Sequence, residues 1–193
     1  MTTESKLDIA SNKAEFISRI SCAEREGVDF LLNYLDASGF FEAPASTKYH
    51  MSCEGGLCKH SLSVCDRLLN NLEAKLRYPT ETLVICALLH DVCKANYYAV
   101  DYRNVKQPSG TWAKEPYYTV KDGFPYGHGE KSVYIVGKHV CLTDDEAMAI
   151  RWHMGAFDEA HKGGSYALGQ VFKDYPLALH LHIADLQATY LDE

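Results

Sequence analysis

The sequence lacks both the long apolar run of a membrane protein and the leader of a secreted one. Its longest apolar run, which begins at Leu83, is far shorter than the roughly 18 residues that indicate a membrane span. The first residues contain no basic region followed by an apolar core, which is the pattern of a secretory signal. We therefore expect a cytoplasmic protein without a membrane partner.

Paired cysteines and a surplus of basic residues are missing as well. The seven cysteines are scattered and do not form the two paired clusters of a structural zinc module, which favours a reduced protein. Lysine and arginine number 19 against 26 aspartates and glutamates, so the formal net charge is −7. This charge argues against a long nucleic-acid partner, which usually meets a basic surface. It is compatible with a small phosphorylated substrate, because a metal ion can supply positive charge locally.

The remaining composition is that of one folded domain, with 193 residues of which 47% are hydrophobic and 23% charged. We expect a single domain over residues 1–193, with N-terminal scaffold helices in residues 1–45 and a catalytic core in residues 50–186. Hydrophobic periodicity predicts an all-α fold, a bundle of six or seven helices. Aromatic and β-branched runs on both sides of a turn signal predict one inserted β-hairpin at about residues 96–120, within an insert over residues 96–126.

Two segments have the form of a capping box, a four-residue pattern that begins many helices. They are residues 21–24 (Ser-Cys-Ala-Glu) and 143–146 (Thr-Asp-Asp-Glu), and we expect a helix to follow each. Residues 156–174 contain a Gly-Gly pair and lack a clear helical pattern, so we expect a loop there.

The most informative stretch is residues 83–94, where an apolar run ends in the pair His90-Asp91 and Lys94 follows. A segment that is apolar on all sides is normally buried. A buried imidazole beside a buried carboxylate costs free energy unless something pairs with the charge, and a divalent cation would pair with both. Lys94 lies one turn after His90 and would face the same site. The alternative for the pair alone is a His–Asp hydrogen bond within the core.

Further metal-competent side chains occur where a polar group needs an explanation. His60 borders the buried face of a helix that follows a Gly-Gly pair, although His60 alone is also compatible with a histidine bound to a backbone carbonyl. His128 lies between two glycines at a helix start, His153 ends a helix, and Asp185 lies in the middle of an apolar helix. Imidazole and carboxylate ligands suit Mn, Fe, Ni, Co, Zn or Mg. The sequence therefore predicts a metal site built from several helices.

Taken together, these residues resemble the HD-domain metal-dependent phosphohydrolases. The matching stretches are His50 with Gly55-Gly56-Leu57-Cys58-Lys59-His60-Ser61, then Ala87-Leu88-Leu89-His90-Asp91-Val92-Cys93-Lys94, Gly127-His128-Gly129, Arg151-Trp152-His153-Met154-Gly155 and His180-Leu181-His182-Ile183-Ala184-Asp185. Within the family the pattern is most similar to the HD domains of bacterial 3′→5′ exoribonucleases and of uncharacterised phage and bacterial HD hydrolases. One departure is Cys93, which stands where the family usually has glycine.

The resemblance implies an HD-domain helical bundle that holds one or two divalent metal ions. One ion would be held by His60, His90, Asp91 and Asp185, and a second by His128 and His153 with Asp91 bridging. Lys94 matches the family lysine that contacts the substrate phosphate or assists catalysis, and His50 matches a histidine that precedes the glycine pair. The candidate catalytic residues are therefore Asp91, Lys94 and His50. Lys94 and His50 would also contact the substrate, and His50 would protonate the leaving oxygen.

The implied reaction is hydrolysis of a phosphomonoester or phosphodiester by metal-activated water, as in a nucleotidase or phosphodiesterase. Because the chain is acidic and carries no attached nucleic-acid-binding domain, we expect a small phosphorylated molecule, first of all a nucleotide, as the substrate. The hairpin insert follows the His-Asp-Lys stretch directly, so Tyr97, Tyr98 and Trp112 could stack on a substrate ring as part of a lid. The alternative is a solvent-exposed flap with ordinary strand aromatics.

Two other functions stay open at this point. A di-iron oxygenase would keep the metal site and change its chemistry, as a few relatives of this fold do. A non-enzymatic signalling or interaction module would carry a vestigial site, but such a module has no reason to bury the full set of candidate ligands. The sequence is also compatible with a homo-oligomer.

Overall fold

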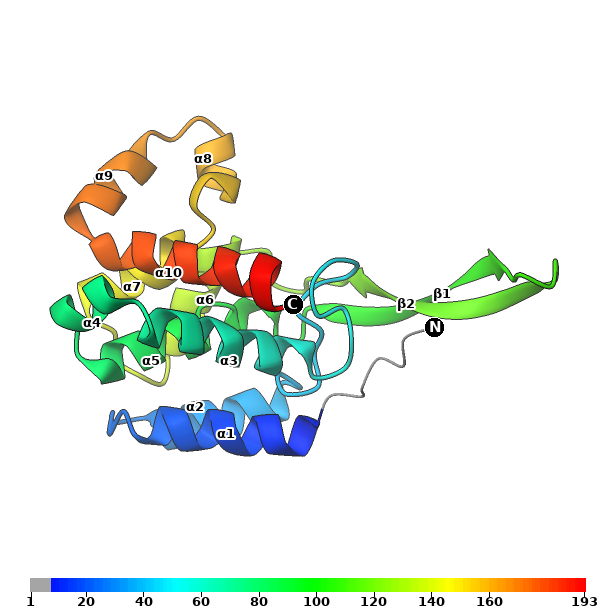
Figure 1. Cartoon of the computed structure of the whole chain (residues 1–193), viewed down its shortest axis with the longest axis horizontal. Helices are drawn as coiled ribbons and strands as arrows, with labels where there is room; N and C mark the ends of the chain where they lie inside the picture. Colours follow the sequence, from blue (N-terminus) through cyan, green and yellow to red (C-terminus); the bar gives the residue numbers. More distant parts are fainter. Residues whose placement is uncertain (1–7) are drawn as a thin grey trace.

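The computed structural model describes residues 8–193, which form a helical body with a long β-hairpin projecting from one end (Figure 1). The helices are α1 (Ile9–Ser21), α2 (Val28–Ala37), α3 (Gly56–Leu69), α4 (Leu72–Arg77), α5 (Thr80–Leu89), α6 (His128–Gly137), α7 (Asp144–Trp152), α8 (Glu159–Lys162), α9 (Ala167–Asp174) and α10 (Pro176–Gln187). The strands are β1 (Tyr98–Lys106) and β2 (Trp112–Val120). The expected helical fold with one inserted hairpin is confirmed.

The expected number of six or seven helices is wrong, since the described residues contain ten α-helices. The loop expected over residues 156–174 is also wrong, because α8 and α9 lie in it. α4 and α8 span 6 and 4 residues, which is too short for a helical period to show in the sequence. The side chain of Asp158 accepts a hydrogen bond from the backbone N–H of Ala160 and so begins α8.

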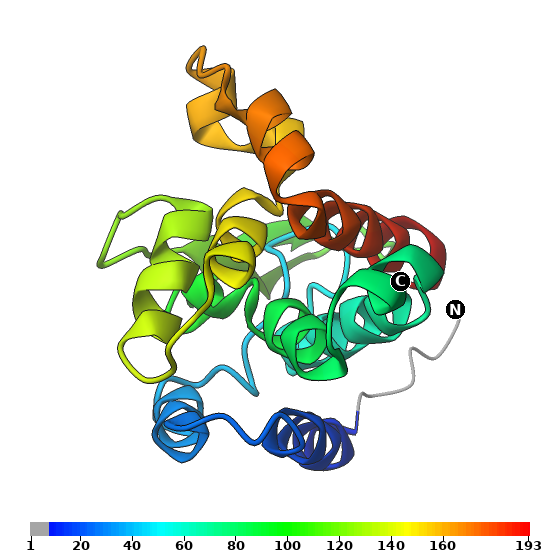
Figure 2. The same ribbon diagram turned by 90° about the vertical axis from the view of Figure 1, so that its left-hand side faces the viewer.

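The helices lie in layers around α5 (Figures 1 and 2). α1 and α2 lie side by side below α3 and α5, α10 packs against both α3 and α7, and α8 and α9 form a lobe outside α10. Every residue from 83 to 89 is at most 6% exposed, so the end of α5 reaches the centre of the body. Although α5 is apolar on every side, it spans only 10 residues, and no helix within residues 8–193 is long and apolar enough to cross a membrane.

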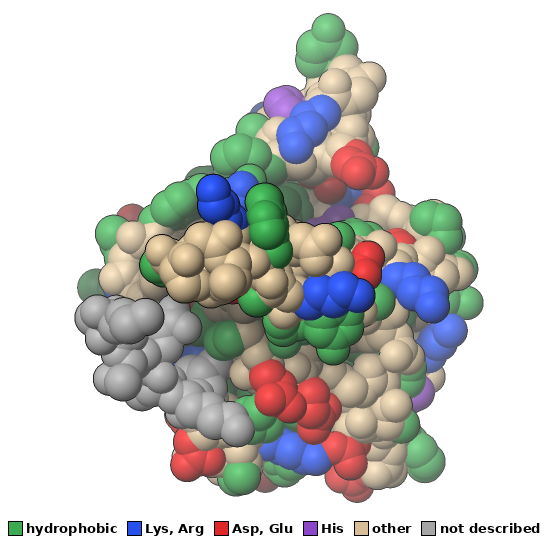
Figure 3. Space-filling model, turned by 90° about the vertical axis from the view of Figure 1, so that its right-hand side faces the viewer, with side chains coloured by type: hydrophobic (Ala, Val, Ile, Leu, Met, Phe, Trp, Pro, Cys, Tyr) green, Lys and Arg blue, Asp and Glu red, His purple; other side chains and the backbone are tan. Residues whose placement is uncertain are grey.

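The hairpin has the predicted position and leaves the helical body. Its strands pair antiparallel from Tyr98 opposite Val120 to Lys106 opposite Trp112. The pairing places Val100, Tyr102 and Trp112 on one face, where they are 55%, 62% and 68% exposed. Figure 3 views the molecule from the end where the hairpin projects, and apolar and basic side chains lie together at this end. The far half of the hairpin therefore extends into solvent.

The two predicted capping boxes have different outcomes. Thr143 and Glu146 form a complete capping box at the start of α7. Residues 21–24 do not begin a helix, because α1 continues to Ser21 and α2 starts only after Gly27. Gly27 has φ +88°, and a Cβ there would lie 1.8 Å from the carbonyl oxygen of His139. The start of α2 is thus set by a close approach between distant segments, which a four-residue pattern does not contain.

Candidate metal centre

The end of α5 delivers two predicted ligands into the centre of the molecule. The helix ends at Leu89, His90 follows as its C-cap, and Asp91 leaves the helical conformation with φ −106° and ψ 18°. A 3-10 turn (Val92–Lys94) then brings Lys94 back, with its Nζ 2.6 Å from Oδ2 of Asp91. His90 and Asp91 are 0% and 2% exposed, so both need partners inside the protein.

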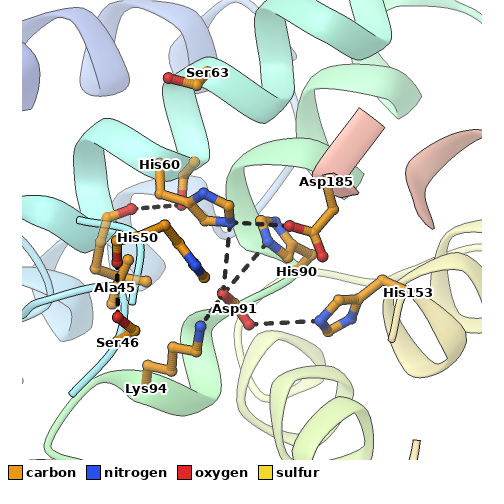
Figure 4. Close-up of polar contacts among 12 residues, drawn as sticks. Ala45, Ser46, His50, His60, Ser63, His90, Asp91, Lys94, His153 and Asp185 are labelled. Atoms are coloured by element: carbon orange, nitrogen blue, oxygen red, sulfur yellow. Dashed lines mark hydrogen bonds and ion pairs between the residues drawn. The ribbon is translucent and has the colours of Figure 1, made fainter. Parts of the chain in front are cut away.

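Asp91 lies between two groups of imidazoles (Figure 4). Its Oδ2 is 3.5 Å from Nε2 of His90 and 3.9 Å from Nε2 of His60. Its Oδ1 is 2.8 Å from Nε2 of His128 and 3.5 Å from Nε2 of His153. One carboxylate therefore turns one oxygen to each group, as a carboxylate shared between two metal ions does.

Asp185 of α10 completes the first group. Its Oδ1 lies 3.2 Å from Nε2 of His60. His60, His90 and Asp185 each place a ligand atom within 4.8 Å of the others, and His90, Asp91 and His153 do the same. The structure thus brings all the sequence-predicted metal ligands to one place, although they come from α3, α5, α6, α7 and α10 or from the residues that cap them.

Two of the predicted ligands, His90 and His153, have a buried imidazole nitrogen without a hydrogen-bond partner among the described residues. His90 donates through Nδ1 to the carbonyl of Ala87 (2.8 Å), and His153 donates through Nδ1 to the carbonyl of Ile150 (2.7 Å). Each bond fixes the tautomer, so that each Nε2 carries a lone pair. Both Nε2 atoms are buried without a hydrogen bond, and each lies 3.5 Å from an oxygen of Asp91. A bound cation would satisfy both atoms, so the residues present fit a metal ion.

The charges of the centre also suit a cation. Burial alone would raise the pKa of Asp91, but Lys94 and the surrounding histidines hold it well below its usual range. Burial likewise opposes ionisation of Asp185, but the hydrogen bond from His60 and the charges of the surrounding histidines together outweigh it, so the pKa of Asp185 is also lowered. Both carboxylates are therefore ionised near neutral pH. Burial lowers the pKa of His153, which keeps this imidazole neutral and able to coordinate.

Metal binding is expected to release protons, because two histidines are charged in the metal-free protein. Burial lowers the pKa of His60, but Asp185 and Glu193 raise it to about 9. Burial also lowers the pKa of His128, while Cys93 and Asp91 raise it to about 10. Coordination requires neutral imidazole, so about two protons should leave these histidines at pH 7.5 and the apparent affinity should rise with pH up to these values. Calorimetric titration in buffers of different ionisation enthalpy measures this release, and a buffer-independent enthalpy would contradict the prediction.

Glu193 is a neighbour of the centre that the sequence does not reveal. Its side chain is buried, and its Oε1 and Oε2 lie 3.1 and 3.2 Å from Nδ1 of His60. A π-helical turn (Ala188–Asp192) brings it there, and Arg67 of α3 fixes this turn by donating from Nε to Oδ2 of Asp192 (2.7 Å). A carboxylate on the outer nitrogen of a metal-binding histidine orients the ring and raises its basicity.

Replacing this carboxylate by a neutral amide is expected to weaken the subsite that contains His60. A Glu193→Gln variant should bind metal there about tenfold more weakly, since loss of such outer partners typically costs about 10–100-fold in affinity. Titration calorimetry with Mn²⁺ or Co²⁺ measures the change. Glu73→Gln, which changes an exposed residue of α4, is the control. Equal affinities in the two variants would show that Glu193 does not support the site.

His50 lies beside the predicted ligands in a tightly closed loop. Ser46 donates from Oγ to the carbonyl of His50 (2.7 Å), and the N–H of Ala45 donates to the carbonyl of Met51 (3.1 Å). The ring of His50 lies 4.9 Å from that of His60, and its Nε2 is buried without a hydrogen-bond partner among the described residues. Burial lowers the pKa of His50, so its imidazole is neutral near pH 7 and can accept a proton.

A cavity of about 740 Å³ opens over this group of ligands. Its floor includes Asp91 and Lys94, and Lys162 adds a second cationic side chain to its wall. Three aromatic residues line it and are 54–79% exposed, and these are Tyr49, Phe157 and Tyr190. The carboxylates of Asp91, Asp185 and Glu193 also line the cavity. Exposed aromatic rings beside two lysines suit a ligand that combines a phosphate with a planar ring. No sequence pattern marks these three residues, because long-range packing alone brings them to the cavity.

The hairpin aromatics lie elsewhere. Tyr97 lines a neighbouring cavity of about 350 Å³ that shares His128 and Lys162 with the first. Tyr98 donates from its hydroxyl to the carbonyl of Ala45 (3.1 Å) and so fixes the loop that carries His50. Trp112 lies at the far end of the hairpin, away from the ligand cluster. In this structure the base of the hairpin supports the loop beside the site, and the hairpin does not cover the candidate metal ligands.

Comparison of the chain with protein-family models, with curated proteins and with solved structures finds no match.

Proposed function

We propose that this chain is a metal-dependent phosphohydrolase that acts on a small phosphorylated molecule, with a nucleotide as the first candidate. The observation that carries this proposal is Asp91, whose two oxygens face two groups of buried imidazoles with unpaired Nε2 atoms at His90 and His153. A shared carboxylate between two imidazole groups is the arrangement of a two-metal hydrolase. His60, His90, Asp91 and Asp185 would hold one ion, and Asp91, His128 and His153 the other.

Metal ions bound there would acidify a water molecule and draw charge from a phosphoryl oxygen. The chain's own residues supply the rest of the machinery. Lys94 is held by Asp91 and borders the cavity, so its ammonium group can stabilise charge that develops on the phosphate. His50 lines the same cavity, and its neutral imidazole can take up a proton from the attacking water and return it to the leaving oxygen.

The cavity favours a small substrate over a long polymer. Its volume of about 740 Å³ falls in the range of about 300–1,000 Å³ that is typical of small-molecule sites. Tyr49 and Tyr190 offer faces on which a nucleobase can stack, which is worth about 1–3 kcal/mol per base. Lys94 and Lys162 supply positive charge for a phosphate within a chain of net charge −7.

The direct test is hydrolysis of phosphate esters by the metal-loaded protein. Nucleoside monophosphates, cyclic nucleotides and dinucleotides should be screened with Mn²⁺, Co²⁺, Fe²⁺, Ni²⁺, Zn²⁺ and Mg²⁺ in turn. A Lys94→Met variant keeps the side-chain stem and should lose about 10²-fold in kcat with unchanged metal content, because the lysine acts on the phosphate and not as a ligand. A loaded wild-type protein that hydrolyses none of these esters would contradict the proposal.

A further inference from the structure

Cys93 carries a thiol beside the second group of ligands. It follows Asp91 by two residues in the 3-10 turn, and its Sγ lies 3.4 Å from Nδ1 and 3.8 Å from Nε2 of His128. Nε2 of His128 in turn lies 2.8 Å from Oδ1 of Asp91. Asp91, Cys93 and His128 each offer a ligand atom within 4.8 Å of the others. This group brings sulfur into a centre that is otherwise built from nitrogen and oxygen.

The thiol is held in place from two sides. The backbone N–H of Cys93 donates to Oγ of Ser132 (3.1 Å), which ties the 3-10 turn to α6, and His128 is the first residue of that helix. The start of α6 is pressed against α7, since a Cβ on Gly129 would lie 2.1 Å from the carbonyl oxygen of Arg151. Cys93 itself is 3% exposed. The sulfur and the imidazole are therefore fixed relative to each other.

The spacing fits two ligands of one ion. With a metal–sulfur bond of about 2.3 Å and a metal–nitrogen bond of about 2.1 Å, a tetrahedral ion separates the two ligand atoms by about 3.6 Å. Sγ of Cys93 lies 3.8 Å from Nε2 of His128. A second, independent sign of a cation is Nε2 of His153, which is buried, has no hydrogen-bond partner among the described residues and lies 3.5 Å from Oδ1 of Asp91. One oxygen, one nitrogen and one sulfur atom thus converge, and a second nitrogen lies beside the same oxygen.

We propose that Cys93 is a thiolate ligand of the ion held by Asp91, His128 and His153, and that it sets the metal preference of this subsite. On binding, the thiol forms a metal–sulfur bond and releases its proton to solvent. Thiolate donors favour Zn²⁺, Co²⁺ and Fe²⁺ over Mg²⁺ and Mn²⁺, which prefer oxygen. The inference rests on the metal centre of the proposed function and names the cofactor class of one of its two subsites.

Cobalt(II) gives a direct readout, because a thiolate bound to Co²⁺ produces a sulfur-to-metal charge-transfer absorption in the near ultraviolet that nitrogen and oxygen ligands do not. The wild-type protein loaded with Co²⁺ should show this band. Cys93→Ser should lose the band and should bind Zn²⁺ on the order of tenfold more weakly, with little change for Mn²⁺. Cys141→Ser, which changes an exposed cysteine, should keep both properties.

The outcomes separate this inference from the proposed function. Stoichiometric Co²⁺ without the band in the wild-type protein would show that Cys93 only packs against His128, and would leave the metal centre itself standing. A wild-type protein that binds no Co²⁺, Zn²⁺ or Mn²⁺ would overturn both. The decisive band is measured on the wild-type protein, so the test holds even where the serine variant folds poorly.

Discussion

An Asp91→Asn variant is expected to lose both metal ions. Its rate of phosphoester hydrolysis should fall by a factor on the order of a thousand or more. This carboxylate faces both imidazole groups, with Oδ2 toward His60 and His90 and Oδ1 toward His128 and His153. The amide has the same shape but no charge, and one of its two ends donates instead of accepting. The subsite of His128 and His153 then keeps no carboxylate, and the subsite of His60 and His90 keeps only that of Asp185.

Elemental analysis of protein purified without a metal-affinity tag measures this loss, and hydrolysis assays on the same samples measure the rate. The wild-type protein should carry about two metal ions per chain if both groups bind one ion each. Asp101→Asn changes an exposed aspartate of β1 and should leave both metal content and activity unchanged. Retention of two ions by Asp91→Asn would show that Asp91 does not bridge the subsites.

The candidate ligands could be predicted because each of them breaks a local rule. His90 and His153 are polar residues at the ends of helices whose cores are apolar, and Asp185 lies among apolar residues within a helix. The structure shows a feature common to His90 and His153 that the sequence pattern does not reveal. His90 and His153 both cap their helices, and both donate through Nδ1 to the carbonyl three residues before. The helix end itself therefore aims each Nε2 at the centre.

Residues that distant packing brings to the site could not be predicted. Glu193 reaches His60 only because a π-helical turn follows α10 and Arg67 anchors it, and neither contact leaves a local pattern. The hairpin is a second example of this limit on prediction from sequence. Alternation and the turn signal gave its position and pairing, but the direction in which it leaves the body decides that Trp112 lies far from the ligands.

An Arg25→Ala variant is expected to lose about 3–5 kcal/mol of unfolding free energy, because it leaves the buried carboxylate of Glu146 without its cation. Arg25 lies between α1 and α2, and its Nη2 is 3.0 Å from Oε1 of Glu146, whose side chain is 0% exposed. Thr82 of α5 also donates to Oε1 (2.9 Å), and the N–H of Thr143 donates to Oε2 (2.9 Å). These hydrogen bonds remain in the variant, but the positive charge that pairs with the carboxylate is lost.

Thermal unfolding should show this loss as a decrease of roughly 10 °C in Tm for a chain of this length. Arg103→Ala changes an exposed arginine of the hairpin and is the control. The second variant Arg25→Ala/Glu146→Gln should recover much of the stability, since it removes the unpaired charge and keeps an amide oxygen as acceptor. Equal stability of Arg25→Ala and the wild-type protein would contradict the assignment of the pair as a buried anchor.

The position of this ion pair relates it to the metal centre. Arg25 contacts Glu81 in the first turn of α5 and Glu146 in the first turn of α7. The other ends of these two helices carry His90 and His153 as C-caps. Since a helix is rigid along its axis, holding the two starts together restricts how far apart the two imidazoles can lie. We therefore expect Arg25→Ala to weaken metal binding at temperatures well below its Tm. The double variant Arg25→Ala/Glu146→Gln lacks the same cross-link and should not recover the lost affinity. Calorimetric titration of both variants at 15 °C separates loss of stability from loss of alignment.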